Sequence, residues 1–113
     1  MKSLFEAQTE FALLVAALIQ KADQMGYKVT LGEAWRSPES AKANAKLGKG
    51  ISNSLHVSRL AIDLNLFKNG RYLDKTEDHR ALGEWWEKQH PQCVWGGRFS
   101  DGNHYSFSWQ GRK

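Results

Sequence analysis

The sequence contains few of the residues that cross-link or interrupt a chain. Its 113 residues include a single cysteine, Cys93, and two prolines. One cysteine can form no internal disulfide and supports no cysteine-rich zinc knuckle, so stability must come from packing, with or without a metal. The longest apolar run, residues 11–19, is shorter than the roughly 20 residues that cross a bilayer. Glu6 and Glu10 lie where a signal peptide carries only positive charge. We therefore expect no membrane insertion and no export by a signal peptide.

The chain also has little excess charge. Sixteen Lys and Arg against twelve Asp and Glu leave a net charge of +4, which mildly favours polyanions such as nucleic acid or bacterial wall polymer. The basic residues cluster only at Lys42, Lys46 and Lys49, which is too thin a patch to predict a nucleic-acid partner. With 41% hydrophobic and 25% charged residues, the composition is typical of a globular protein. We expect one domain over residues 1–113 and a monomer.

Local patterns predict an α+β fold with a small, mainly antiparallel sheet and flanking helices. Ser3 and Glu6 form a capping-box pattern, and Asn69-Gly70 is the pair that a type I′ hairpin turn requires. Apolar periodicity then places helices near residues 4–25, 38–47 and 76–90, and strands near 27–31, 60–67, 72–73, 94–95 and 105–107. Residues 48–53 are expected to form a loop, and His79 is expected to be a solvated histidine on the last helix.

Four polar residues stand out because packing does not explain them: His56, Asp63, Asp101 and His104. Asp63 interrupts the apolar strand 60–67, where a carboxylate has to be solvated, paired or bound to a metal. A solvent-facing position on a one-sided sheet would explain Asp63 alone equally well. Together, however, histidines and a carboxylate from two distant segments are the donors that catalytic zinc accepts, with a fourth position left to water.

These residues stand in a pattern that resembles a known family. The segment from Ser54 to Leu64, SLHVSRLAIDL, is similar to the S-x-H-x-x-G-x-A-x-D signature of the zinc D-Ala-D-Ala carboxypeptidase family. That family includes the phage L-alanyl-D-glutamate endolysins and has the hedgehog/DD-peptidase fold. Asp101-Gly102-Asn103-His104 resembles its second motif, and Arg36 matches an arginine near the start of the domain. The sequence departs from the pattern at Arg59, where the family usually has glycine, so the conformation of that loop and the substrate-side geometry are open.

The resemblance implies a role for each matching residue. His56, Asp63 and His104 would bind Zn²⁺, Asp101 would act as general base and acid, and Arg36 would stabilise the oxyanion. Ser54 is expected either at the substrate or in contact with a ligand residue, although a simple loop hydroxyl explains this serine at least as well. We also expect Trp95 and Trp109 to line the substrate groove, although tryptophans in a domain of this size commonly belong to the core.

The resulting functional hypothesis is a zinc peptidase that cuts a peptidoglycan stem-peptide bond, with L-alanyl-D-glutamate as the first choice. Such an enzyme would collect in the cytoplasm of a bacterial host before lysis and then act on the cell wall. The alternatives are a D-Ala-D-Ala carboxypeptidase, a non-catalytic zinc-containing module that binds a wall peptide or a protein, and, more remotely, a metal-dependent nuclease.

Overall fold

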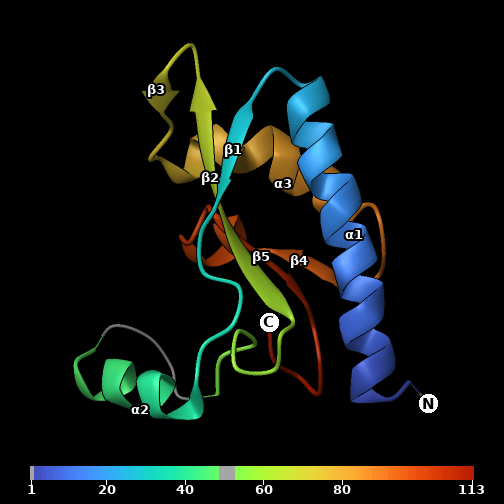
Figure 1. The fold of residues 1–113 in the computed structure, drawn as a ribbon, viewed down its shortest axis with the longest axis vertical. Helices are drawn as coiled ribbons and strands as arrows, with labels where there is room; N and C mark the ends of the chain where they lie inside the picture. The colour runs from blue at the N-terminus through green and yellow to red at the C-terminus, as the bar shows by residue number, and fades with distance from the viewer. Residues whose placement is uncertain (1, 49–52) are drawn as a thin grey trace.

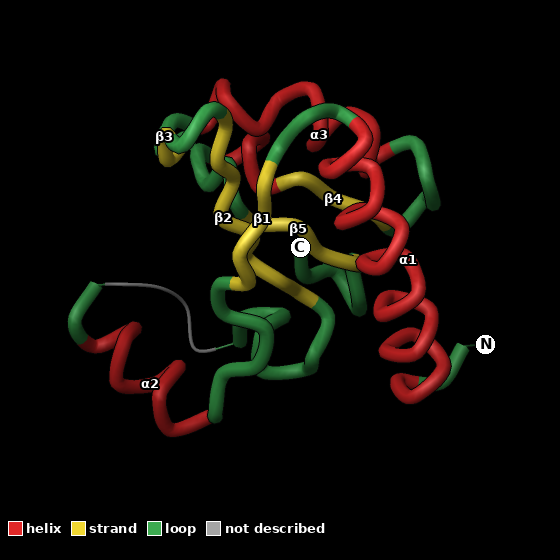
Figure 2. The backbone as a smooth tube through the Cα atoms, turned by 45° about the horizontal axis from the view of Figure 1, so that its top comes forward, coloured by secondary structure: helices red, strands yellow, loops and turns green. Residues whose placement is uncertain are grey.

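The computed structural model describes residues 2–48 and 53–113 and has the α+β architecture expected from the sequence. The described strands form one antiparallel sheet in the order β1-β2-β5-β4. β3 pairs with the C-terminal end of β2. The strands are β1 Lys28–Leu31, β2 Ala61–Lys68, β3 Arg71–Tyr72, β4 Cys93–Trp95 and β5 His104–Phe107. The helices are α1 Leu4–Gln24, α2 Pro38–Lys46 and α3 Arg80–Glu87, with 3-10 turns at Thr76–His79 and Gly96–Phe99. Helices α1 and α3 contact each other beside the sheet, whereas α2 lies apart from it (Figure 1, Figure 2).

The ends of the elements follow from local sequence signals. The Ser3 hydroxyl accepts a hydrogen bond from the Glu6 N–H, and the Glu6 carboxylate accepts one from the Ser3 N–H, so the predicted capping box starts α1. Asn69 and Gly70 both have positive φ, 53° and 76°, as a type I′ turn requires. This turn pairs Phe67 with Tyr72 and thereby adds β3 to the sheet.

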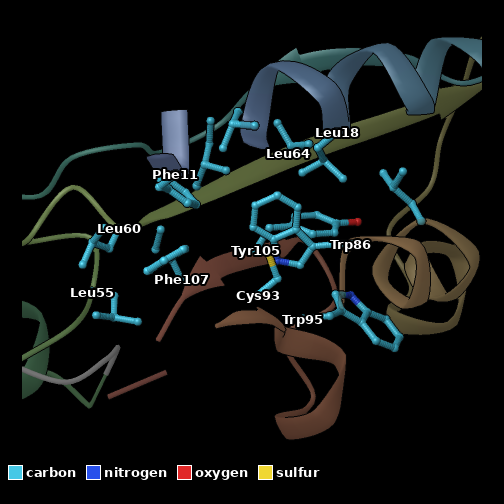
Figure 3. Close-up of a cluster of buried hydrophobic side chains, with 14 of the residues drawn as sticks. Phe11, Leu18, Leu55, Leu60, Leu64, Trp86, Cys93, Trp95, Tyr105 and Phe107 are labelled. Atoms are coloured by element: carbon cyan, nitrogen blue, oxygen red, sulfur yellow. The ribbon is translucent and has the colours of Figure 1, made fainter. Parts of the chain in front are cut away.

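The core lies between α1, α3 and the sheet (Figure 3). α1 contributes residues at helical spacing, namely Ala7, Phe11, Val15, Leu18 and Ala22. Trp86 of α3 is fully buried and makes edge-on contacts with the rings of Phe11 and Tyr105, at centroid distances of 6.0 and 6.3 Å. Burying a large apolar side chain of this kind contributes about 1.5–3 kcal/mol to folding. No helix in the described part of the chain is long and apolar enough to span a membrane.

Two expectations need correction here, and a third lies largely outside the described residues. The helix predicted near residues 76–90 is split, because Thr76–His79 forms a 3-10 turn and α3 begins only at Arg80. His79 is not solvated: it is 3% exposed, and its Nδ1 lies 2.7 Å from the Tyr105 hydroxyl oxygen. Burial lowers the pKa of His79 to about 4, so its ring is neutral at physiological pH. The predicted loop at 48–53 and Lys49 lie mostly or wholly outside the described residues.

Candidate metal centre

Strand pairing brings two of the predicted ligands together. β2 alternates, so Ile62 and Leu64 are buried in the core while Asp63 points to the other face with its side chain 23% exposed. In the antiparallel pairing of β2 with β5, Asp63 stands directly opposite His104. The Nδ1 atom of His104 consequently lies 3.7 Å from Oδ1 of Asp63. The metal centre is therefore built on the register of this strand pair.

The third predicted ligand, His56, is held by a series of turns that precede β2. The Ser54 hydroxyl accepts a hydrogen bond from the His56 N–H at 3.2 Å, and His56 is only 3% exposed. Its Nδ1 lies 3.2 Å from the carbonyl oxygen of Ala34. A carbonyl can only accept, so Nδ1 carries a proton, and in the neutral ring Nε2 is left with a lone pair. That Nε2 atom faces Oδ1 of Asp63 at 3.3 Å.

The arrangement fits a metal ion. One ligand atom from each of His56, Asp63 and His104 lies within 4.8 Å of the other two. Two acceptor atoms that face each other, such as Nε2 of His56 and Oδ1 of Asp63, repel unless a proton or a cation lies between them. Oδ1 of Asp63 and Nε2 of His104 are buried and have no hydrogen-bond partner among the described residues. Two imidazole nitrogens and one carboxylate oxygen form a donor set that catalytic zinc uses.

The electrostatics of the centre favour a negatively charged Asp63. Partial burial opposes its ionisation, but the adjacent His104 and His56 rings lower the pKa of Asp63 to about 2. Burial likewise works against a charged His56, and the Asp63 carboxylate more than offsets this and raises the pKa of His56. The carboxylate is thus ionised throughout the neutral range, as a metal ligand has to be.

Asp101 lies beside this centre. Its N–H donates to the Gly96 carbonyl at 2.9 Å, and its own carbonyl accepts from the His104 N–H at 3.1 Å. Oδ2 of Asp101 is 3.8 Å from Nδ1 of His104, and about half of the Asp101 side chain remains exposed. Partial burial and the nearby Asp63 carboxylate raise the pKa of Asp101, although His104 acts in the opposite direction. A solvent-accessible carboxylate with a raised pKa is suited to accept and release a proton.

Arg36 reaches the centre together with a residue that the sequence did not single out, Glu33. The Nε atom of Arg36 donates to Oε1 of Glu33 at 2.8 Å, and the Arg36 N–H donates to the His56 carbonyl at 3.2 Å. The Glu33 carbonyl accepts from the Asp63 N–H at 2.9 Å, which continues the pairing of β1 with β2. The three-residue spacing of Glu33 and Arg36 was the only signal in the sequence for this ion pair.

Arg59, at the position where the sequence departs from the pattern by lacking glycine, has a left-handed backbone conformation. Its φ is 58°, in the left-handed region that glycine favours and that most residues avoid. The Arg59 guanidinium lies over the Trp35 ring, 4.7 Å from its centroid, which is a cation–π contact. The turn between His56 and β2 thus contains a non-glycine residue in a conformation that glycine favours.

The two tryptophans predicted at the substrate groove lie outside the cluster of His56, Asp63 and His104. Trp95 is fully buried, and its Nε1 donates to the Gly102 carbonyl at 2.7 Å, so the prediction that it contacts substrate is wrong. The Trp95 ring packs directly against the backbones of Gly83 and Gly97. A Cβ atom at either glycine would lie 2.2 Å from the ring, so these positions accommodate Trp95 only as glycine. Trp109 follows the end of β5 away from His104 and lines a pocket with Lys2 and other residues outside the metal centre.

Comparison with known proteins supports the fold. No protein family model matches the sequence, and no curated protein is significantly similar to it. Among solved structures, the chain is similar to the Serratia marcescens L-Ala D-Glu endopeptidase ChiX, with a TM-score of 0.68 and 18% sequence identity. The match covers 84% of this chain and 77% of that one. At this level of identity the similarity concerns the fold, and the metal centre stands on its own geometry.

Proposed function

We propose that this protein is a zinc-dependent peptidoglycan peptidase that hydrolyses a stem-peptide bond, most specifically the L-alanyl-D-glutamate bond. The observation that carries the proposal is the convergence of two histidines and one aspartate, whose buried Oδ1 has no hydrogen-bond partner, beside a second carboxylate at Asp101. The fold it shares with an L-Ala D-Glu endopeptidase supports the choice of substrate.

In this proposal His56, Asp63 and His104 hold the zinc ion. The bound ion would supply Lewis-acid chemistry, activating a water molecule and polarising the scissile carbonyl group. The hydrogen bond from Nδ1 of His56 to Ala34 fixes the ring so that Nε2 points to the centre. Ser54 acts as a positioning residue, because its buried hydroxyl holds the backbone of His56.

Asp101 performs the proton transfer. Its carboxylate takes a proton from the attacking water as the oxygen bonds to the carbonyl carbon, and it delivers that proton to the amine nitrogen when the C–N bond breaks. Arg36 lies close enough to influence the charge of both His56 and Asp101. Its guanidinium donates to the oxygen that becomes negative in the tetrahedral intermediate, and Glu33 holds it in place.

The test starts with purified peptidoglycan and the wild-type protein, with a chelator and with zinc added back. The proposal predicts turbidity loss that the chelator stops and zinc restores, and mass spectrometry should find newly freed L-alanine carboxyl groups. Release of terminal D-alanine alone would identify the carboxypeptidase alternative instead. A folded, zinc-loaded protein that releases nothing would contradict the proposal and favour a binding module.

Two variants test the assigned roles. Asp101→Asn should bind zinc as the wild type does and lose about 10²–10⁴-fold in turnover, the usual contribution of a general base. Asp23→Asn, at an exposed carboxylate near the end of α1, is the matched control and should retain activity. His56→Ala should lose both zinc and activity while remaining folded. An Asp101→Asn protein with full activity would remove the proposed base.

A further inference from the structure

A pocket of about 370 Å³ lies next to the candidate metal centre. None of the three proposed ligands lines it. It is lined by Asn53, Leu55, Phe99, Gly111, Arg112 and Lys113. The Phe99 ring is 46% exposed and meets the His104 ring edge-on, with 5.6 Å between the ring centroids. Leu55 directly precedes His56 in the chain. The pocket thus adjoins the candidate metal centre through the Phe99–His104 contact and through Leu55, the chain neighbour of His56.

Arg112 is held rigidly at this pocket. Residues 109–112 form a tight turn, with positive φ at Gln110 and Gly111 and two hydrogen bonds between the backbones of Trp109 and Arg112. The guanidinium is anchored as well: one terminal nitrogen donates to the Asn53 carbonyl at 3.1 Å, and the other donates to the Ser58 hydroxyl at 3.0 Å. A guanidinium has five N–H donors, so these bonds leave others available to a ligand.

The charge of Arg112 has no carboxylate partner. Within residues 2–48 and 53–113, no Asp or Glu oxygen lies within 4.0 Å of it, while Arg36, Arg80 and Arg98 each pair with a glutamate. The remaining residues, Met1 and 49–52, include no acidic side chain. No Asp or Glu side chain lines the pocket. The pocket is therefore suited to an anionic group, and the planar guanidinium favours a carboxylate.

We propose that this pocket is a substrate subsite in which Arg112 binds a carboxylate of the stem peptide, while Phe99 contacts the aliphatic part of the same substrate. The inference rests on the proposed function, because it takes the stem peptide as the substrate. A D-glutamate residue has two carboxyl groups and the peptide chain uses one, so the other is free. A diamino acid further along the peptide supplies a second possible carboxylate. Arg112 would thus be a specificity-determining residue outside the catalytic machinery.

The first experiment uses the wild-type protein and three synthetic muropeptides of otherwise identical sequence. One has both carboxylates free, one has the D-glutamate carboxylate converted to a carboxamide, and one has the diamino-acid carboxylate converted. A carboxylate bonded to a guanidinium loses a charge-assisted interaction on amidation, so we expect about a tenfold rise in KM for one of the two amidated peptides with kcat unchanged. The affected peptide identifies which carboxylate is bound.

The second experiment compares variants on the same peptides. Arg112→Gln should raise KM for the free carboxylate peptide by about tenfold and should leave KM for the sensitive amide unchanged. Arg112→Lys, which keeps the charge, should restore part of the discrimination. Arg71→Gln removes the same charge from the exposed β3 hairpin and is the matched control, so it should discriminate as the wild type does.

Arg112 also supports the loop that carries His56, and the design separates this structural role from the binding role. A purely structural effect would lower zinc affinity and turnover on all three peptides alike. If Arg112→Gln retains the wild-type discrimination, or if the wild type does not distinguish the peptides, the subsite is overturned while the peptidase assignment stands. If the wild type cleaves none of them, the proposed function fails and the subsite fails with it.

Discussion

Gly96→Ala is the substitution that tests most directly whether backbone packing positions the ligands. Gly96 is buried at the start of the 3-10 turn before Asp101, and its φ suits any residue. A Cβ placed there would lie 2.2 Å from the Asp101 carbonyl oxygen and 2.6 Å from Cβ of His104. Contacts at Cβ atoms essentially never fall below 3.0 Å, so the Asp101 carbonyl would have to move by at least the difference, about 0.8 Å.

This movement is large compared with what a metal site tolerates. Ligand distances in metal sites hold within about 0.2 Å of their usual values, and the backbone of Asp101 bonds directly to that of His104. We therefore expect Gly96→Ala to weaken zinc binding at least tenfold, the lower end of the effect seen when the surroundings of ligands are changed. Overpacking should also lower the free energy of unfolding by about 1–3 kcal/mol.

The assay is competition for zinc against a chromophoric chelator, combined with urea unfolding of the metal-free protein. Gly26→Ala is the control: its φ of 91° strains an alanine, but nothing lies within 4 Å of the added methyl group. It should lose about 1 kcal/mol of stability and keep its zinc affinity. If Gly96→Ala binds zinc as tightly as the wild type, the ligands are not positioned by this packing and the reasoning is refuted.

Three further predictions concern other sites. The pKa of His79 is about 4 when folded and 6.5 for the free side chain, so its contribution to stability is present above pH 6.5 and disappears as the pH falls toward 4. Between pH 7.5 and 4.5, the free energy of unfolding in urea should therefore fall by about 2–3 kcal/mol more in the wild type than in His79→Gln. Equal decreases in the two proteins would contradict this prediction. Because Arg59 has positive φ, Arg59→Gly should be more stable than Arg59→Ala by about 1 kcal/mol in the same assay, as both variants lose the contact with Trp35. Burial raises the pKa of the Cys93 thiol to about 12, so alkylation at pH 8 should be slow until the protein is unfolded, and rapid labelling of the native protein would show that the thiol is accessible.

The parts of the fold that the sequence predicted well are those that depend on neighbouring residues. The start of α1 depends on Ser3 and Glu6, three residues apart, and the β2–β3 hairpin depends on Asn69-Gly70. The alternation along β2 likewise separates a buried face from the face that carries Asp63. Such signals act over a few residues, so they are visible in the chain before any tertiary contact is known.

The errors have the opposite origin. His79 is buried against Tyr105, which lies 26 residues later in the chain. No local sequence pattern predicts that contact. Trp95 was placed at the groove on chemical grounds, but Gly83 and Gly97 leave room for its ring inside the protein. The sequence likewise made no prediction about Arg112, because its anchoring to Asn53 spans 59 residues. For the metal centre, the motifs indicated the residue types, whereas the register that sets Asp63 against His104 required the structure.

The pairing of β2 with β5 has a consequence for how the protein would acquire its metal during folding. Asp63 and His104 are 41 residues apart in the chain. Closing that loop therefore costs conformational entropy before the two side chains can form any stabilising contact. A displacement of the pairing by two residues would set Asp63 opposite Gly102 or Ser106, and neither offers an imidazole. Before that pairing forms, only two of the three proposed ligands, His56 and Asp63, lie close together in the chain. Under the proposed function, tight zinc binding would follow correct pairing, so the rate of zinc uptake during refolding would report the rate at which this strand register forms.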